Sequence, residues 1–143
     1  MTKKKKALPE NCPCGSGLAY AACCGALHAG ARAATPEALM RSRYAAYALG
    51  LEDYLLSTWA PETRPERIFE PGEAPFKWVS LEVRASGETP GAGGEPDTGF
   101  VDFVARARSS RGAVKLAEHS RFRREKTGAS ADRWLYVDGD IEE

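Results

Sequence analysis

The chain has 143 residues, of which 43% are hydrophobic and 28% are charged, enough to bury one core and hardly two. Its 20 basic and 20 acidic residues cancel, so no overall charge attracts the protein to nucleic acid. No apolar run approaches the ~20 residues that a membrane-spanning helix needs, and we expect one soluble globular unit.

The chain begins with a basic segment. Four consecutive lysines, Lys3 to Lys6, are not followed by the apolar stretch of a secretory signal. We therefore expect residues 1–10 to be a flexible basic tail and the protein to be cytoplasmic.

All the cysteines of the chain lie in one short polar segment: Cys12, Cys14, Cys23 and Cys24. A tetrahedral zinc ion with Zn–S bonds of ~2.3 Å needs its sulfurs ~3.8 Å apart, which two close pairs can supply when a tight turn folds one onto the other. The glycines of the Gly15-Ser16-Gly17 run can make that turn. Disulfides within either pair would be strained, and a reducing cytoplasm disfavours those between pairs. We predict a structural Zn²⁺ bound by the four thiolates, with redox dithiols and unliganded thiols as alternatives.

The segment around these cysteines is too poor in apolar side chains to fold unaided. Residues 8–30 contain only a few sizeable ones, Leu8, Leu18, Tyr20 and Leu27, against an ordering entropy of roughly 1.5 kcal/mol per residue. A structural zinc contributes an apparent ~10–16 kcal/mol, so we expect residues 11–30 to form a zinc knuckle that is ordered only with metal. Four protein ligands leave no open position for water, which makes catalysis by this zinc unexpected. His28, four residues after Cys24, is an alternative ligand in place of one thiolate.

Two helices are predicted next. Thr35-Pro36-Glu37 is a typical helix start, with a capping hydroxyl, a proline at the first position and an acid at the positive end of the dipole. The helix should cover 36–49 and end at Gly50. A shorter helix is expected over 52–59, stopped by Pro61. Residues 60–75 then predict a loop with one helical turn around Arg67.

The pattern then changes to strands. Val79, Leu81 and Val83 alternate with polar residues while Trp78 has the opposite parity, which predicts a β-bulge near Trp78. Glycines and prolines over 86–97 indicate a mobile loop. A hairpin of 100–108 and 114–124 around 109–112 and a last strand over 134–137 complete the pattern. Two helices followed by a bent antiparallel sheet make an α+β cone over residues 31–143.

One strand face of the hairpin carries polar groups among apolar ones. Glu118 and Ser120 alternate with Leu116 and Phe122, and a buried carboxylate needs a partner. Arg43, or Arg106 and Arg108 across the hairpin, could pair with Glu118 or leave it facing a wet cavity. The candidate pocket residues are Arg43, Tyr47, Trp59, Trp78, Glu118, Ser120, Phe122, Trp134 and Tyr136. The alternative is that the aromatic residues fill the core and Glu118 closes a structural ion pair.

Catalysis is not favoured by these residues. Glu118 is the one candidate general base, acting if burial raises its pKa. His119 has the opposite parity and should point away from Glu118. The sequence has no Ser-His-Asp order, no Walker loop and no dinucleotide fingerprint.

A second basic cluster lies near the end of the hairpin, at Arg121, Arg123, Arg124 and Lys126. With Lys3 to Lys6 it makes binding of nucleic acid or the ribosome a weaker hypothesis. A solvated charged surface is the favoured interpretation.

The cysteine pattern resembles a known motif. Cys-x-Cys-Gly-Ser-Gly, five intervening residues and then Cys23-Cys24 is similar to the SEC-C motif, the zinc knuckle at the C-terminus of the SecA translocation ATPase. The fourth ligand of that family is Cys or His, and here Cys24 takes the position. The customary lysines of the motif are replaced by Leu18-Ala-Tyr-Ala-Ala22, which weakens any inherited binding to acidic lipid, ribosome or chaperone.

Most of the remaining chain resembles the bacterial YchJ family, in the runs over 39–44, 54–55, 58–59, 118–122 and 134–139. That family joins a SEC-C knuckle to a nuclear-transport-factor-2-like domain, so the resemblance implies a zinc ion and a cone with a cavity between helices and sheet. It implies no particular reaction. We therefore expect a non-catalytic binding or adaptor module, with a protein partner at the knuckle or a small molecule in the cone. The sequence does not fix an oligomeric state.

Overall fold

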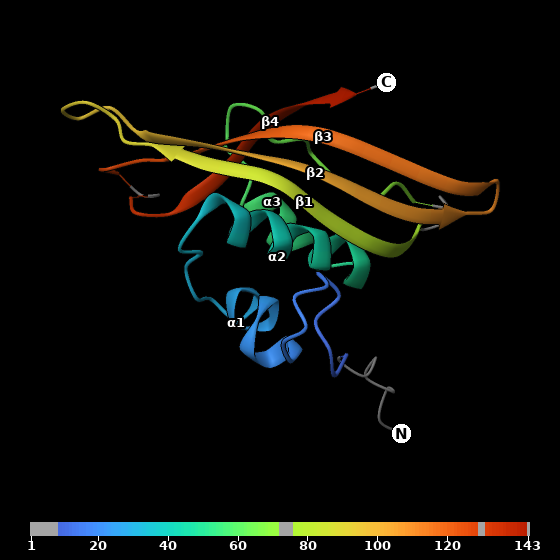
Figure 1. The fold of residues 1–143 in the computed structure, drawn as a ribbon. Helices are drawn as coiled ribbons and strands as arrows, with labels where there is room; N and C mark the ends of the chain where they lie inside the picture. The colour runs from blue at the N-terminus through green and yellow to red at the C-terminus, as the bar shows by residue number, and fades with distance from the viewer. Residues whose placement is uncertain (1–8, 72–75, 129–130, 143) are drawn as a thin grey trace.

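The structure is a computed structural model that describes residues 9–71, 76–128 and 131–142. Its strands form one antiparallel sheet in the order β1-β2-β3-β4: β1 (Lys77–Thr89), β2 (Asp97–Ser109), β3 (Gly112–Arg124) and β4 (Trp134–Glu142). Helices α2 (Pro36–Leu49) and α3 (Glu52–Ser57) lie against the sheet, and α1 (Cys24–His28) lies on the side of α2 that faces away from it (Figure 1). A short 3-10 helix, η1 (Tyr20–Ala22), precedes α1. The predicted α+β class is confirmed. The lysines at 3–6 lie outside the described residues.

Helix α2 has the predicted bounds because both of its ends are capped. The Thr35 hydroxyl accepts a hydrogen bond from the amide of Ala38 at 3.0 Å, and Pro36 occupies the first helical position. Gly50 ends the helix with φ of +75°, a left-handed conformation that glycine adopts without steric cost.

The second helix ends earlier than predicted. Helix α3 stops at Ser57 because the next residues hydrogen-bond to β4: Tyr136 N donates to Thr58 O, and Ala60 N donates to Tyr136 O, both at 2.8 Å. The predicted helical turn around Arg67 is wrong, since the described residues there are not helical. The Glu52 carboxylate accepts hydrogen bonds from the amides of Ile68 and Phe69 at 3.0 and 2.8 Å, which holds that segment in an irregular conformation.

The predicted bulge near Trp78 is confirmed by a register shift between Trp78 and Ser80. Val79 is the extra residue of the bulge and is 56% exposed, so the prediction that it shares a face with Leu81 is wrong. Two more register shifts, at Val83/Ala85 and Arg121/Phe122, were not predicted. Because each bulge adds twist and bend, the three together curve the sheet over α2.

The strands are longer than their sequence pattern predicted. Part of the expected 86–97 loop pairs in the sheet, with Ser86 opposite Val101 and Thr89 opposite Thr98, and only 90–96 remain as a loop. The backbone of that loop is tied down, since the Asp97 carboxylate accepts from Gly91 N at 2.9 Å. Strand β4 likewise continues past the predicted end at Val137 to Glu142. The predicted hairpin turn is confirmed, with Ser109 paired to Gly112.

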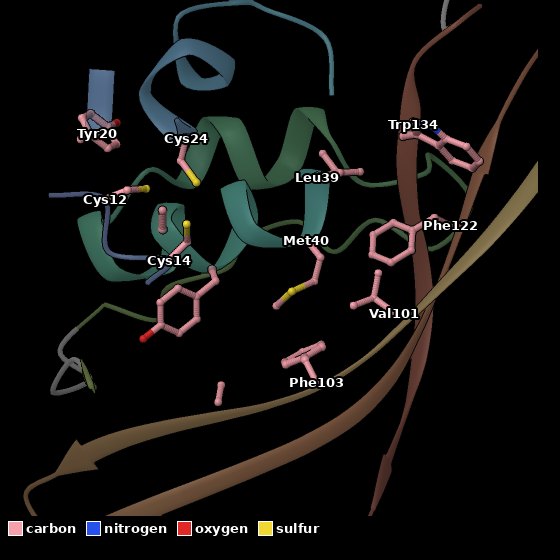
Figure 2. Close-up of a cluster of buried hydrophobic side chains, with 13 residues drawn as sticks. Cys12, Cys14, Tyr20, Cys24, Leu39, Met40, Val101, Phe103, Phe122 and Trp134 are labelled. Atoms are coloured by element: carbon pink, nitrogen blue, oxygen red, sulfur yellow. The ribbon is translucent and has the colours of Figure 1, made fainter. Parts of the chain in front are cut away.

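One hydrophobic cluster runs through the molecule. Figure 2 shows cysteines of the N-terminal segment at one end, Leu39 and Met40 of α2 in the middle, and Phe122 and Trp134 of the sheet at the other end. The N-terminal segment therefore shares its buried surface with α2 and the sheet.

Gly99 on β2 marks the closest approach of the sheet to the start of α2. A methyl group on Gly99 would lie 2.4 Å from Cγ of Pro36, which is fully buried. We expect Gly99→Ala to lower the free energy of unfolding by about 1–3 kcal/mol, because the helix must move to relieve the overlap. Urea denaturation measures this, with Gly94→Ala as the control because its added methyl would meet nothing within 4 Å. Equal losses in the two variants would contradict the close packing.

Candidate metal centre and adjoining cavity

The four cysteine thiols meet at one point between the N-terminal loop and α1. Their Sγ atoms all lie within 4.8 Å of one another. Cys14 Sγ is 3.6 Å from Cys23 Sγ, which is 4.0 Å from Cys24 Sγ. These separations bracket the ~3.8 Å edge of a tetrahedron of sulfurs around zinc. The four cysteines are unbridged, so the site fits a four-coordinate metal that prefers sulfur.

A tight backbone turn produces this convergence. Gly15 N donates to Cys12 O at 3.2 Å, and Cys12 N donates to Leu18 O at 3.0 Å. Gly15 and Gly17 have φ of +80° and +83°, which a residue with a side chain rarely adopts. The glycines thus return the chain so that the second cysteine pair faces the first.

The pKa values of the cysteine thiols are shifted in different directions. A hydrogen bond with the Cys24 thiol lowers the pKa of Cys14, and the same bond raises the pKa of Cys24. Burial raises the pKa of the Cys12 thiol. A divalent cation bound among these thiols would favour their ionised forms.

The cysteine segment is fixed to α2 by polar contacts as well as by packing. Arg41 Nη1 donates to the carbonyl of Cys14 at 3.0 Å, and Arg41 Nε donates to Glu37 at 2.9 Å. Cys14 is fully buried and Cys24 is 2% exposed. Cys12 is buried as well, whereas Cys23 is half-buried, so three of the four thiols are shielded from solvent.

His28 is a structural link between α1 and α2. Its Nε2 lies 2.8 Å from the carbonyl oxygen of Ser42, which can only accept, so Nε2 carries the proton. Nδ1 therefore accepts from the Tyr20 hydroxyl at 2.5 Å. The ring also packs edge-on against Tyr54, with centroids 4.6 Å apart. Both ring nitrogens are engaged away from the thiols, which argues against His28 as an alternative metal ligand.

His28 also predicts a pH dependence of stability. Burial lowers the pKa of His28 from its ordinary value of 6.5, because the folded protein favours the neutral ring. Its contribution is therefore complete above pH ~6.5 and is lost as the pH falls through the lower folded pKa, where the unfolded chain already binds the proton. We expect the difference in unfolding free energy between wild type and His28→Gln to change over this range.

Urea denaturation between pH 7.5 and 5 measures that difference. Both proteins carry the same four cysteines, so acid-driven loss of a metal affects them alike. His28→Ala should cost about 2–4 kcal/mol at pH 7.5, since it removes two hydrogen bonds and the buried ring. His119→Gln, at the half-exposed second histidine, is the control. A pH profile shared by wild type and His28→Gln would contradict this role.

A cavity of about 220 Å³ lies between α2 and the sheet. Of the predicted pocket residues, it brings together Arg43, Tyr47, Trp78, Glu118, Ser120, Phe122 and Tyr136. Trp59 and Trp134, both within the described part of the chain, are not among its lining residues. Trp59 stacks edge-on against Tyr136 at 4.9 Å, behind the cavity wall, and Trp134 lies under the Arg124 guanidinium at 4.9 Å.

Arg43 is the most buried charge at this cavity, with 6% of its surface exposed. Its Nη1 donates to Leu55 O at 2.8 Å and to the Thr58 hydroxyl at 2.6 Å. Its guanidinium lies over the rings of Trp59 and Tyr136, at 5.0 and 4.6 Å from their centroids. Burial lowers the pKa of Arg43, and these aromatic and carbonyl contacts offset part of the cost of burying the charge.

Glu118 has partners other than those considered from the sequence. Its Oε2 accepts hydrogen bonds from the Ser120 hydroxyl and, at 3.2 Å, from the Tyr136 hydroxyl. Among the described residues no arginine forms an ion pair with it, and Arg106 and Arg108 are exposed. The reason is strand parity: Arg106 and Arg108 have the parity opposite to the inward-facing Phe103, Ala105 and Ala107.

Several residues that line the cavity were not among the predicted pocket residues: Met40, Tyr44, Phe103, Ala105 and Leu116. Their signals were present in the pattern. Met40 and Tyr44 share a helical face with Arg43 and Tyr47 at spacings of three and four residues, and Phe103 and Ala105 alternate along β2.

The basic cluster at the end of the hairpin is neutralised by carboxylates. Arg121 pairs with Asp138 and Asp140 at 2.6 and 2.7 Å. Arg123 pairs with Glu62 and Glu125, and Arg124 pairs with Asp97. Lys126 donates to the carbonyl of Gly91 at 2.7 Å.

Within the described ranges, no helix is both long and apolar enough to cross a bilayer.

Comparison with known sequences finds two matches within the chain. Residues 35–139 match the family described as "YchJ, middle NTF2-like domain", and residues 9–26 match the SEC-C motif. The chain is 47% identical over 143 residues to a UPF0225 protein of Bordetella pertussis, covering 97% of this chain and 98% of that protein. It is 48% identical over 141 residues to a UPF0225 protein of Chromobacterium violaceum, covering 96% and 97%.

Two solved structures are similar. One is the solution structure of RPA3114, a SEC-C motif containing protein from Rhodopseudomonas palustris, with a TM-score of 0.72 and 37% identity over 93% of this chain and 99% of that chain. The other is the crystal structure of a SEC-C motif containing protein from Psychrobacter arcticus, with a TM-score of 0.66 and 27% identity over 92% and 82%. Both are described as SEC-C motif containing proteins, which agrees with the motif match over residues 9–26.

Proposed function

The chain belongs to the YchJ family, and on that premise we propose that it is a binding module with two parts. A structural Zn²⁺ held by Cys12, Cys14, Cys23 and Cys24 orders the N-terminal segment. The cavity between α2 and the sheet receives a small-molecule ligand.

The zinc part is supported by the geometry of the thiols and by the matched motif. Four Sγ atoms within 4.8 Å of one another can complete a tetrahedral shell without a further ligand. When bound, the ion would supply structure and no open coordination position. A cluster of four reduced thiols also suits a reducing compartment, which supports placing the protein in the cytoplasm.

The observation that carries the binding function is the cavity itself. Its walls are largely aromatic and aliphatic, while Arg43, Glu118 and Ser120 supply a few polar groups, the composition typical of a small-molecule site. Met40 and Tyr44 line the cavity and also belong to the buried cluster that contains Cys14 and Cys24. The metal segment thus packs behind one wall of the cavity and helps to fix its shape.

Catalysis is not part of the proposal. Glu118 accepts two hydrogen bonds from side chains of the protein, from Ser120 and Tyr136, rather than standing next to a second acid or base. His119 contacts Asp102 through Nδ1 at 2.5 Å and stacks on Phe100. Because neither His119 nor another acid or base among the described residues stands beside Glu118, the carboxylate suits the holding of a ligand better than proton transfer.

A fragment screen by ligand-observed NMR tests the binding function. We expect small aromatic molecules to bind the wild-type protein, and Ala105→Leu to abolish binding because the larger side chain fills the cavity that Ala105 lines. Ala113→Leu, exposed on the same hairpin, is the matched control and should bind as wild type does. A screen without binders, or binders unaffected by Ala105→Leu, would overturn the proposal.

A protein partner at the cysteine segment is the second candidate. Leu18 lies at the turn between the cysteine pairs and is 54% exposed, so its apolar side chain is available to a partner. A partner captured by the wild-type protein should be lost with Leu18→Ser and kept with Ile141→Ser, a similarly exposed residue on β4. The carboxylates that neutralise Arg121, Arg123 and Arg124 support leaving nucleic acid out of the proposal.

A further inference from the structure

Two opposite charges line the cavity between α2 and the sheet. Arg43 and Glu118 both contribute to its wall, and Tyr136 contacts both of them. The guanidinium of Arg43 lies 4.6 Å from the centroid of the Tyr136 ring, and the hydroxyl of the same tyrosine donates to Glu118 at 3.2 Å. Arg43 therefore lies over the ring of the tyrosine whose hydroxyl binds Glu118, and no ion pair joins the two charges among the described residues.

Arg43 has hydrogen-bonding capacity left. Its two short hydrogen bonds come from Nη1 and go to neutral acceptors, Leu55 O and the Thr58 hydroxyl. Beyond a weak hydrogen bond with the Tyr47 hydroxyl, its other nitrogens make no hydrogen bond within the described chain, and no carboxylate there pairs with it. Because its side chain is 6% exposed and lines the cavity, an acceptor for these nitrogens must come from inside the cavity.

Glu118 has the complementary capacity. Ser120 and Tyr136 both donate to its Oε2, as they would to an ionised carboxylate. Its Oε1 accepts no hydrogen bond from the described residues. A molecule in the cavity that carries an N–H or O–H group can donate to this oxygen.

The charges of Arg43 and Glu118 in the cavity wall also determine the net charge of the ligand. Burial raises the pKa of Tyr47 and of Tyr136, so both hydroxyls stay neutral and the wall carries one positive and one negative charge. A ligand with a net charge would leave one unbalanced charge in a poorly solvated space, which is costly. A neutral ligand with a donor and an acceptor satisfies both groups.

The size of the cavity limits the ligand further. A cavity of ~150 Å³ with apolar walls holds benzene, and this one measures about 220 Å³. The aromatic walls, including Tyr44, Trp78 and Phe122, suit the faces and edges of a ring. There is room for one ring and a short polar arm.

We propose that the cavity binds an uncharged aromatic molecule of this size, whose polar group donates a hydrogen bond to Glu118 and accepts one from Arg43, as a carboxamide does. The inference rests on the proposed binding function and specifies its ligand class.

Three probes of one skeleton test it: 3-phenylpropanamide, 3-phenylpropanoate and 3-phenylpropylammonium. Each is titrated into the metal-loaded full chain at pH 7.5, with affinity measured from amide chemical shifts of residues around the cavity. The neutral amide should bind at least ~10-fold more tightly than either ion. In Glu118→Gln, where the charge of Arg43 is no longer balanced, the carboxylate should gain at least ~10-fold relative to the amide. In Arg43→Met the affinity of the ammonium should rise relative to that of the amide by a similar factor. This variant provides a second readout if Glu118→Gln folds poorly.

The outcomes separate this inference from the binding function. Equal affinities for the three probes, or an order unchanged by Glu118→Gln, would overturn the ligand class while the cavity remains a binding site. If none of the probes binds although other fragments do, in a manner abolished by Ala105→Leu, the ligand class is again wrong and the binding function stands. If neither probes nor fragments bind, both are contradicted.

Discussion

Cys14→Ser is expected to release zinc and to unfold residues 11–30, the largest effect of any single substitution considered for this chain. A structural zinc contributes an apparent ~10–16 kcal/mol to the order of a small site, comparable to the whole stability of a domain at ~5–15 kcal/mol. Cys14 is fully buried, and its backbone anchors Arg41. Serine would leave three thiols with a poor fourth ligand.

The measurement is the zinc content per chain together with backbone amide spectra. We expect about one zinc ion in the wild type and a large loss in the variant, with the resonances of 11–30 collapsing to unfolded positions. Chelation of the wild-type protein should reproduce this spectrum. Ala21→Ser, an exposed position in the same segment, is the control and should keep both metal and structure. A Cys14→Ser protein that keeps its dispersed spectrum for 11–30 would contradict the role of the metal.

The second large effect is expected at Arg43. Arg43→Ala should lower the free energy of unfolding by about 3–5 kcal/mol, because it removes the hydrogen bonds to Leu55 O and the Thr58 hydroxyl, removes contacts with two rings and leaves the charge of Glu118 unbalanced. Arg43→Lys should cost less, since it keeps the charge, yet more than about 1 kcal/mol, since an ammonium cannot reproduce the planar fork between the rings. Urea denaturation measures both.

Arg106→Ala is the matched control for Arg43. Arg106 was an alternative partner for Glu118 on sequence grounds, and it is exposed in the structure. Its removal should change the free energy of unfolding by less than ~0.5 kcal/mol. If Arg106→Ala lowered the free energy of unfolding as much as Arg43→Ala does, the assignment of Arg43 as the charge that balances Glu118 would be contradicted.

The sequence predicted those elements that are determined by contacts between residues close together in the chain. Thr35, Pro36 and Gly50 define α2 through contacts within a few residues of each other. The change of parity at Trp78 is a property of one strand, and it predicted the bulge. Glu118, Ser120 and Phe122 face the cavity because alternate residues of a strand share a face.

Contacts between distant segments could not be predicted in this way. Residues 58–60 leave the helix because Tyr136, far along the chain, offers two backbone hydrogen bonds. His28 was considered as a metal ligand, and its real partners, Tyr20 and the carbonyl of Ser42, become neighbours only when α1 packs on α2. The extra length of β1 and β2 across glycine-rich sequence likewise depends on pairing between strands.

X-ray absorption at the zinc edge, on protein purified without added metal, tests the four-cysteine zinc site most directly. We expect one bound zinc ion surrounded by four sulfur atoms at ~2.3 Å and by no nitrogen or oxygen ligand. A shell containing nitrogen or oxygen, or protein that lacks metal while residues 11–30 remain ordered, would contradict this expectation.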